Sequence, residues 1–282
     1  MPCCVRDTIS EMRKQGKFLL FDNVAEFGVW LSGQAISRSI KLIQNHHTWM
    51  PDYTTFKGNN HFALLQSMEN SHIQRGFDGI GQNLTTFPDG TLAVCRAMDK
   101  IPAGIKGANT GGVCMEHVGN FDVGKDQMRQ EHRNGIIGLN AALCHKFALT
   151  PSLDTIVYHH WYDLDTGKRT NGTGNTKTCP GTAFFGGNTT EAAAANFIPL
   201  VVAALTGVAV PAPPTVLSLG SYTVNAPALN VRTGPAATQK FLKQLTKGIL
   251  VDAFEANGDW LRVHSTEQHW VNKRFVTAVA TG

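Results

Sequence analysis

Two histidine pairs and one cysteine are the residues whose type and position favour metal chemistry. His46-His47 and His159-His160 each follow an apolar run that is typical of a buried strand, and Cys179 precedes a proline and a glycine. Two histidines and one cysteine are a ligand set of catalytic zinc sites, which leave the fourth position open for water. Successive residues of a strand face opposite sides, so only one histidine of each pair points toward a shared metal. The spacing leaves open which one.

The competing interpretation is that these histidines are ordinary core or surface residues. Histidine is often partly buried in proteins without any special role, so a single histidine favours that interpretation. Two pairs at the ends of two strand-like runs, together with a cysteine, favour a shared metal site instead.

The elements that must position these residues alternate between helices and strands, which predicts an α/β domain. Helices are indicated by apolar residues at helical spacing, and strands by short apolar runs. Turn residues such as Pro88-Asp89-Gly90 indicate where these elements end. The expected elements are a helix followed by a buried strand within residues 22–43, a helix at 62–73, a hairpin at 76–96, a strand at 113–118, a helix at 126–149 and a strand at 155–159.

A proline-rich linker is expected to divide the chain into two domains. An alanine-rich helix at residues 191–205 is followed by a segment with three prolines between 207 and 217, and prolines make linkers stiff and extended. Short β-type runs with turns between them follow, which indicates a small all-β module. We therefore predict domains at residues 1–206 and 218–282.

Composition excludes several classes of protein. The chain has 282 residues, 42% of them hydrophobic and only 16% charged, which favours folded domains over disorder. Its formal net charge of +4 is mild, and no basic run is dense enough to favour nucleic acid. The six cysteines lack the regular spacing of a disulfide scaffold, so we expect synthesis in a reducing compartment.

The ends of the chain and its apolar runs indicate neither a signal peptide nor a membrane span. The first 17 residues carry charges throughout and lack the apolar run that a signal peptide needs. The longest apolar run, residues 197–210, contains Pro199 and is shorter than the ~20 residues that cross a bilayer. We expect a protein made in the cytoplasm that reaches its site of action by another route.

Four motifs follow one another as they do in the amidase-2 family. They are His46-His47-Thr48, Pro88-Asp89-Gly90, Cys114-Met115-Glu116-His117-Val118-Gly119 and Lys177-Thr178-Cys179-Pro180-Gly181. That family includes phage lysozyme-type amidases, bacterial cell-wall amidases and animal peptidoglycan recognition proteins. The resemblance covers about residues 20 to 190. It implies a central mixed sheet flanked by helices.

The resemblance also implies a site. It assigns one zinc ion per chain to His46, His159 and Cys179, and it assigns the catalytic acid and base to Glu116. Lys177, two residues before the cysteine, matches the basic residue that stabilises negative charge on the substrate oxygen. A carboxylate beside the metal can accept a proton from the attacking water and pass it to the leaving amine.

Two features depart from the pattern of the family. The segment between His159 and Cys179 is longer than usual and is filled by a polar, turn-rich insertion at residues 163–176. Gln82 stands where lysozyme-type members carry an active-site tyrosine, which leaves Glu116 as the expected base. We expect Gln82 and Asn109 to line the substrate groove.

The C-terminal part resembles the bacterial SH3-like domains that are attached to wall hydrolases. Residues 229–235, Trp260 and Trp270 carry this resemblance, which covers about residues 220 to 279. It implies a small SH3-like barrel that binds peptidoglycan. At least one of the two tryptophans is expected to belong to the core of this domain.

Together these features predict an N-acetylmuramoyl-L-alanine amidase of the endolysin or autolysin type, acting on bacterial peptidoglycan. Two alternatives stay open: a peptidoglycan-binding protein without activity, and a zinc peptidase that cuts wall peptides. The intact ligand set and Glu116 favour the enzyme. The absence of a signal peptide favours a phage lysin or a delivered one, and the oligomeric state is not indicated.

Overall fold

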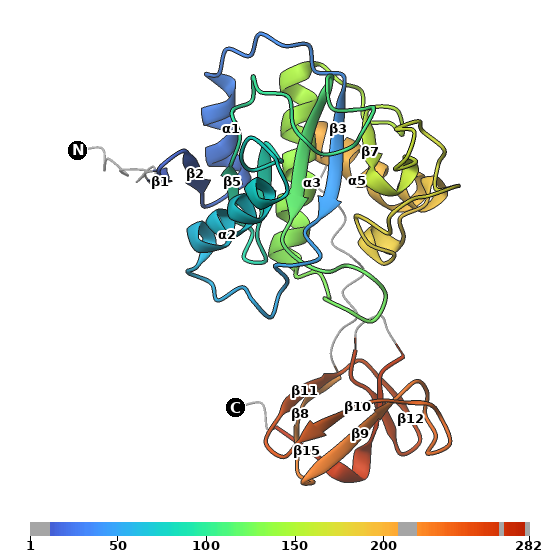
Figure 1. Ribbon diagram of the computed structural model, residues 1–282. Coiled ribbons are helices and arrows are strands. Elements are labelled where there is room, and N and C mark those ends of the chain that lie inside the picture. The colour runs from blue at the N-terminus through green and yellow to red at the C-terminus, as the bar shows by residue number, and fades with distance from the viewer. Residues whose placement is uncertain (1–11, 208–218, 265–267, 280–282) are drawn as a thin grey trace, which may run out of the picture. The chain divides into compact units, whose positions relative to one another are not determined.

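The computed structural model describes residues 12–207, 219–264 and 268–279. The chain divides into two compact units, Met1–Val210 and Pro211–Gly282 (Figure 1). The predicted linker at residues 207–217 lies outside the described residues except for Gly207, as do Cys3 and Cys4. No helix in the described ranges combines the length and the apolar character that a membrane crossing requires.

The first unit is built on a seven-stranded mixed sheet with the strand order β1-β2-β5-β4-β6-β3-β7. The β4, β6, β3 and β7 strands run parallel, and the β1-β2-β5 side is joined to them in antiparallel fashion. The bounds are β1 Arg13–Gln15, β2 Phe18–Phe21, β3 Leu42–His47, β4 Leu84–Thr86, β5 Leu92–Val94, β6 Gly112–His117 and β7 Ile156–Tyr158. The predicted central mixed sheet is confirmed.

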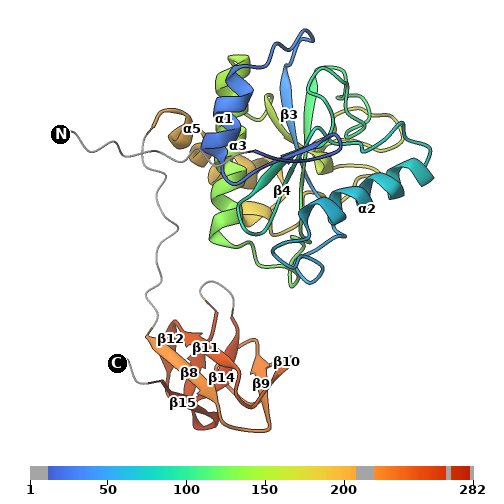
Figure 2. The same cartoon turned by 90° about the vertical axis from the view of Figure 1, so that its left-hand side faces the viewer.

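Helices cover both faces of this sheet, as Figure 2 shows. On one face lie α1 (Val24–Ser32), α3 (Gln130–Phe147) and α5 (Ile198–Leu205), and on the other lies α2 (His61–Gln74). The apolar face of each helix packs on the strands: Phe27, Ile136 and Val201 belong to one buried cluster, and Leu65 belongs to the other. Both faces of the central strands are therefore buried, as parallel sheets require.

Local signals explain where several elements begin and end. The Asn23 side chain accepts a hydrogen bond from the Glu26 N–H and so caps the first turn of α1. The predicted helix at 126–149 begins only at Gln130, because the Asp126 carboxylate is used by the preceding loop, where it accepts from the Tyr53 and Asn120 N–H groups. The hairpin of β4 and β5 turns at residues 88–90 as predicted, and Asp89 bonds His61 of α2 at 2.8 Å.

The structure adds elements that the sequence patterns did not predict. The β1–β2 hairpin at the sheet edge is short, and β1 is exposed and charged, so it carries no apolar alternation. The single helix expected at 191–205 is three pieces: α4 (Thr190–Ala192), a π-helical turn (Ala193–Phe197) and α5. Pro199 lies in the first turn of α5, where a missing N–H is tolerated.

The second unit consists of a five-stranded sheet, β10-β9-β14-β13-β12, and a three-stranded sheet, β11-β8-β15. Its small apolar core includes Val231, Leu261 and Val271. The bounds are β8 Gly220–Val224, β9 Ala228–Arg232, β10 Phe241–Thr246, β11 Leu250–Ala253, β12 Glu255–Asn257, β13 Trp260–Arg262, β14 Trp270–Asn272 and β15 Val276–Ala278. Trp270 is buried and Trp260 is half-buried.

Candidate functional site

Three side chains from separate segments meet at the carboxyl end of the parallel strands. His46 lies near the end of β3, His159 opens the 3-10 helix His159–Trp161 after β7, and Cys179 lies in a later loop. Their candidate ligand atoms all lie within 4.8 Å of one another, and all three residues are buried. The structure therefore brings together the three residues predicted to bind metal.

The other histidine of each pair faces away from this triad. His47 Nδ1 accepts a hydrogen bond from the Phe121 N–H at 3.1 Å. His160 Nδ1 donates to the Lys177 carbonyl at 2.7 Å. In β3 this follows from the alternation of side chains along a strand, which places His46 and His47 on opposite sides. The structure thus places His46 and His159, the first histidine of each pair, in the triad.

The three residues fit a zinc ion. The Nδ1 atoms of His46 and His159 lie 3.2 Å apart, close to the ~3.3 Å that separates two nitrogens bound to one tetrahedral zinc at about 2.0–2.1 Å. Burial lowers the pKa of His46 well below its usual value and that of His159 to about 3, so both imidazoles are neutral. Burial also raises the pKa of the Cys179 thiol, so a thiolate there needs a cation beside it.

The Cys179 loop is held in place by its own backbone and by Asp122. The Cys179 carbonyl accepts from the His160 N–H at 2.7 Å, which ties the two ligand-bearing segments together. The Asp122 carboxylate accepts from the Thr182 N–H at 3.0 Å. Gly181 has φ +118°, and a Cβ at this position would lie 2.4 Å from the Phe121 backbone, so the close approach of the two loops requires glycine.

The polar insertion does not separate the ligands. Its Asp163 carboxylate accepts hydrogen bonds from Thr166 and Asn175, and the Leu164 N–H donates to the Asn175 carbonyl at 2.8 Å. The insertion therefore folds back on itself. His159 and Cys179 meet despite the length of chain between them.

Glu116 lies beside the triad on the neighbouring strand β6, paired in register with His46. Its Oε1 is 3.9 Å from His46 Nδ1, and its Oε2 is buried without a hydrogen-bond partner among the described residues. Burial raises the pKa of Glu116 to about 8, while Lys177 and Arg75 act to lower it. The side chain is 21% exposed, so a substrate or a water molecule in the cleft can reach it. These features suit an acid and base.

A cleft of about 840 Å³ opens above these residues. Its walls come from the loop after β3, from α2 and from the loop that carries Lys177. Among the described residues that line it, Glu116 has the only carboxylate, whereas Arg75 and Lys177 are cations. Such a cleft attracts substrates that carry carboxylates.

The structure places Gln82 and Asn109 outside this cleft. Gln82 is only 1% exposed, and its Nε2 donates to Thr85 Oγ1 at 3.1 Å. Asn109 lies behind the wall, where its Oδ1 accepts from the Gly104 N–H at 2.9 Å. The residues that line the cleft instead include Trp49 and Arg75, which no sequence motif indicated.

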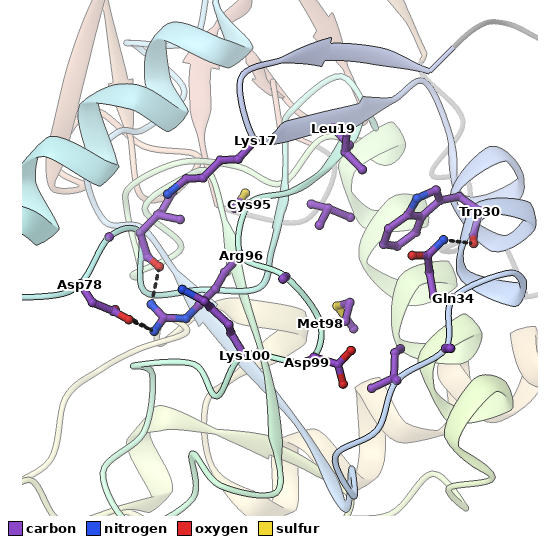
Figure 3. A pocket seen from close by; sticks show the side chains of 16 residues that line it. Lys17, Leu19, Trp30, Gln34, Asp78, Cys95, Arg96, Met98, Asp99 and Lys100 are labelled. Carbon is purple, nitrogen blue, oxygen red and sulfur yellow. Dashed lines mark hydrogen bonds and ion pairs between the residues drawn. The ribbon is translucent and has the colours of Figure 1, made fainter.

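A second pocket, of about 360 Å³, shares no residue with the cleft (Figure 3). Leu19, Trp30 and Met98 give it apolar walls. Arg96 at its edge is already paired, because it bonds both oxygens of Asp78 and the Ile80 carbonyl. None of the residues predicted to do chemistry lines this pocket.

A chain of buried hydrogen bonds runs behind the cleft and ties its strands to α3. The bonds join, in order, Tyr53 Oη to His132 Nδ1 (2.8 Å), His132 Nε2 to Thr86 Oγ1 (2.7 Å), Thr86 Oγ1 to His117 Nδ1 (2.8 Å), His117 Nε2 to Asn45 Oδ1 (3.1 Å) and Asn45 Nδ2 to Asn140 Oδ1 (3.1 Å). Asn45 precedes His46, and His117 follows Glu116. The chain thus joins the two strands that carry the site.

Backbone groups at the two ends of this series of hydrogen bonds determine which group is the donor in each bond. Asn140 Nδ2 donates to the Ile136 carbonyl, so Asn140 Oδ1 accepts from Asn45, and each later donor is then determined in turn. At the other end Tyr53 Oη accepts from the Arg129 N–H. Both histidines therefore carry their proton on Nε2 and are neutral. Burial lowers the pKa of His132 to about 3 and that of His117 well below its usual value.

His132→Gln is expected to change how stability depends on pH. The pKa of His132 rises from about 3 in the folded chain to about 6.5 on unfolding, so the unfolded state binds the extra proton and the wild-type protein loses stability as pH falls below about 6.5. The variant does not lose stability in this way, because glutamine does not bind a proton on unfolding. Urea unfolding should show the variant less stable by about 1–3 kcal/mol at pH 7, with the difference shrinking by about 1.4 kcal/mol per pH unit below 6.5.

His145→Gln is the matched control, because His145 lies on the same helix with its side chain exposed. Its stability at pH 7 should stay within about 0.5 kcal/mol of wild type. A difference for His132→Gln that does not change with pH would contradict a neutral His132 in the folded chain.

The fold and the site together define a class of protein. It is an α/β domain in which a candidate metal triad and a carboxylate lie at the base of one cleft, an arrangement suited to hydrolysis. Residues 36–182, just over half of the chain, match the family model for N-acetylmuramoyl-L-alanine amidase. The chain belongs to the N-acetylmuramoyl-L-alanine amidase family.

Several solved structures resemble part of this chain. The endolysin amidase LysCS from Clostridium intestinale URNW is 21% identical, with 57% of this chain and 88% of that chain covered and a TM-score of 0.40. Drosophila PGRP-LB is 17% identical, with 57% and 83% covered and a TM-score of 0.43. Bumblebee PGRP-SA is 18% identical, with 57% and 87% covered and a TM-score of 0.42. No curated protein sequence matches this chain.

Proposed function

We propose that this protein is a zinc-dependent amidase that hydrolyses the bond between the lactyl group of N-acetylmuramic acid and L-alanine in bacterial peptidoglycan. The observation that carries the proposal is the meeting of His46, His159 and Cys179 within 4.8 Å, beside Glu116 and at the base of a cleft. Membership of the N-acetylmuramoyl-L-alanine amidase family supports the choice of bond.

The zinc ion would be held by His46, His159 and Cys179, and when bound it supplies a Lewis acid that polarises a carbonyl and acidifies water. Glu116 accepts the proton of the attacking water, because its Oε2 has no other partner among the described residues and the side chain reaches the cleft. It then donates that proton to the departing amine of alanine.

Lys177 stabilises the negative charge that develops on the substrate oxygen. It lines the cleft two residues before Cys179, and its positive charge acts on Glu116, His46 and His159 alike. A fixed cation at this position favours the transition state over the neutral amide.

A soluble substrate tests the proposal directly. Incubation with N-acetylmuramoyl-L-alanyl-D-glutamate should release a dipeptide with a free alanine amino group. Removal of metal should abolish the release, and one equivalent of zinc per chain should restore it. Release at full rate by the metal-free protein would show that zinc is not required.

We also propose that the C-terminal unit is an SH3-like module that directs the enzyme to the wall. Its two small sheets around a single apolar core, together with the motif at residues 229–235, support this assignment. A linked module raises the local concentration of enzyme at an insoluble surface, which can multiply apparent affinity by about 10²–10⁴.

Removal of residues 211–282 is expected to separate chemistry from targeting. The shortened protein should keep its rate on the soluble substrate, because every residue of the proposed site lies in the first unit. Its clearance of whole walls should fall by about 10-fold or more. Equal clearance by the full chain and the shortened protein would contradict a targeting role.

A further inference from the structure

Trp49 occupies an unusual position shortly after the first metal-ligand candidate. It follows His46 by three residues, its side chain is 61% exposed, and it lines the wall of the cleft. The neighbouring Met50 is 56% exposed and lines the same wall. Two adjacent large apolar side chains thus face solvent beside the site.

The backbone at Trp49 is strained. Its φ is +58°, a region that a bulky aromatic residue rarely adopts. The Met50 N–H donates to the Thr48 carbonyl at 2.6 Å, which closes a tight γ-turn around Trp49. The Trp49 N–H donates to the Gly119 carbonyl, and Thr48 Oγ1 accepts from the Gly119 N–H, so the segment that follows β6 holds the turn in place.

This combination points to a binding surface. Folding alone favours a relaxed backbone and a buried indole, and at Trp49 neither is found. In contrast, Trp161 in the same unit is completely buried and donates its indole N–H to the Asn188 carbonyl. An exposed apolar side chain presented by a strained turn in a cleft is explained by a ligand that covers it.

The chemistry of the substrate decides which part of it contacts Trp49. The proposed substrate carries a saccharide ring on one side of the amide and a peptide with carboxylates on the other. The face of an indole is electron-rich, so it attracts the C–H groups of a pyranose ring and disfavours a carboxylate. The carboxylates can pair with the cations Arg75 and Lys177, which line the same cleft.

We propose that Trp49 is a specificity-determining residue whose indole packs against the saccharide ring on the muramoyl side of the scissile amide. This inference rests on the proposed amidase function. It requires a preference for substrates with a sugar over substrates that have the same amide without one.

Two substrates separate the sugar contact from the chemistry. N-acetylmuramoyl-L-alanyl-D-glutamate carries the ring, and N-(D-lactoyl)-L-alanyl-D-glutamate keeps the scissile amide without it. Trp49→Ala should lower kcat/KM on the first by about 10-fold, as expected for loss of an aromatic contact in a binding site, and leave the second within about 2-fold. Trp49→Phe should restore most of the activity.

Two further variants guard against a structural explanation. Trp49→Gly removes the strain at positive φ, so it should fold at least as stably as wild type and still lose the preference for the sugar. Val123→Ala, which alters a 71% exposed apolar residue that does not line the cleft, should leave both substrates unaffected.

Equal loss on both substrates, or no loss on either, would overturn the assignment of Trp49. If the wild-type protein cleaves neither substrate, the amidase proposal fails, and titration with the sugar-bearing compound still decides the contact. Isothermal titration calorimetry should then report binding in wild type, with about 10-fold weaker binding in Trp49→Ala. Equal binding by the two proteins would refute the sugar contact.

Discussion

Cys179→Ser is expected to lose bound zinc and hydrolytic activity together. A serine hydroxyl does not ionise near neutral pH, so it replaces the thiolate poorly as a ligand. His46 and His159 alone would bind the metal weakly. Activity on the soluble substrate should fall by at least about 10³-fold, corresponding to about 4 kcal/mol of lost transition-state stabilisation. Elemental analysis and initial rates, measured on the same preparation, check this result.

Cys144→Ser is the control for this experiment, because Cys144 is a buried thiol on α3 outside the triad. It should keep one zinc per chain. Full activity in a zinc-free Cys179→Ser protein would remove the metal from the mechanism, and full zinc content in that variant would remove Cys179 from the ligand set.

Glu116→Gln is expected to abolish most turnover while zinc content stays unchanged. The amide has nearly the shape of the carboxyl group but cannot accept a proton from water, so kcat should fall by about 10²–10⁴. KM should change little, because Glu116 is proposed to act on the proton and not to hold the substrate. The measurement is kcat and KM on the soluble substrate together with elemental analysis.

Glu131→Gln serves as the matched control, since Glu131 is an exposed carboxylate in the first turn of α3. It should turn over at the wild-type rate. A Glu116→Gln protein that keeps its rate would place the base elsewhere, and one that loses its zinc would show that Glu116 helps to bind the metal.

Most of the catalytic fold could be predicted because its elements carry strong local signals. The α2 helix and the β6 strand follow apolar periodicity, and the hairpin of β4 and β5 follows the turn at Pro88-Asp89-Gly90. The β1 and β10 strands were not predicted, because both are exposed along most of their length and lack apolar alternation.

The site was predictable only in part, for a different physical reason. Alternation along a strand predicted that one histidine of each pair would face the metal, but it did not indicate which one, and His159-His160 lie in a 3-10 helix instead of a strand. The resemblance to a family assigned His46 and His159. Residues that act through long-range contacts left no local signal. His132 meets Thr86 across 46 positions of the chain, and the exposure of Trp49 depends on how Gly119 holds its turn.

The expectation for Gln82 shows the same limit. Its position in the motif suggested a place beside the substrate, yet the side chain lies in the core beneath α2, where it contacts Met68 and Thr85. Alignment with a motif places a residue along the chain. Whether its side chain points into the cleft depends on packing that neighbouring elements determine.

Analysis of the products released from isolated bacterial walls tests the proposed function most directly. Mass spectrometry should find stem peptides with a free amino group on L-alanine and glycan strands with free lactyl carboxyl groups, and the zinc-free protein should produce neither. New reducing sugar ends, peptides cut beyond the alanine, or walls that bind the protein and stay intact would each contradict a zinc-dependent N-acetylmuramoyl-L-alanine amidase.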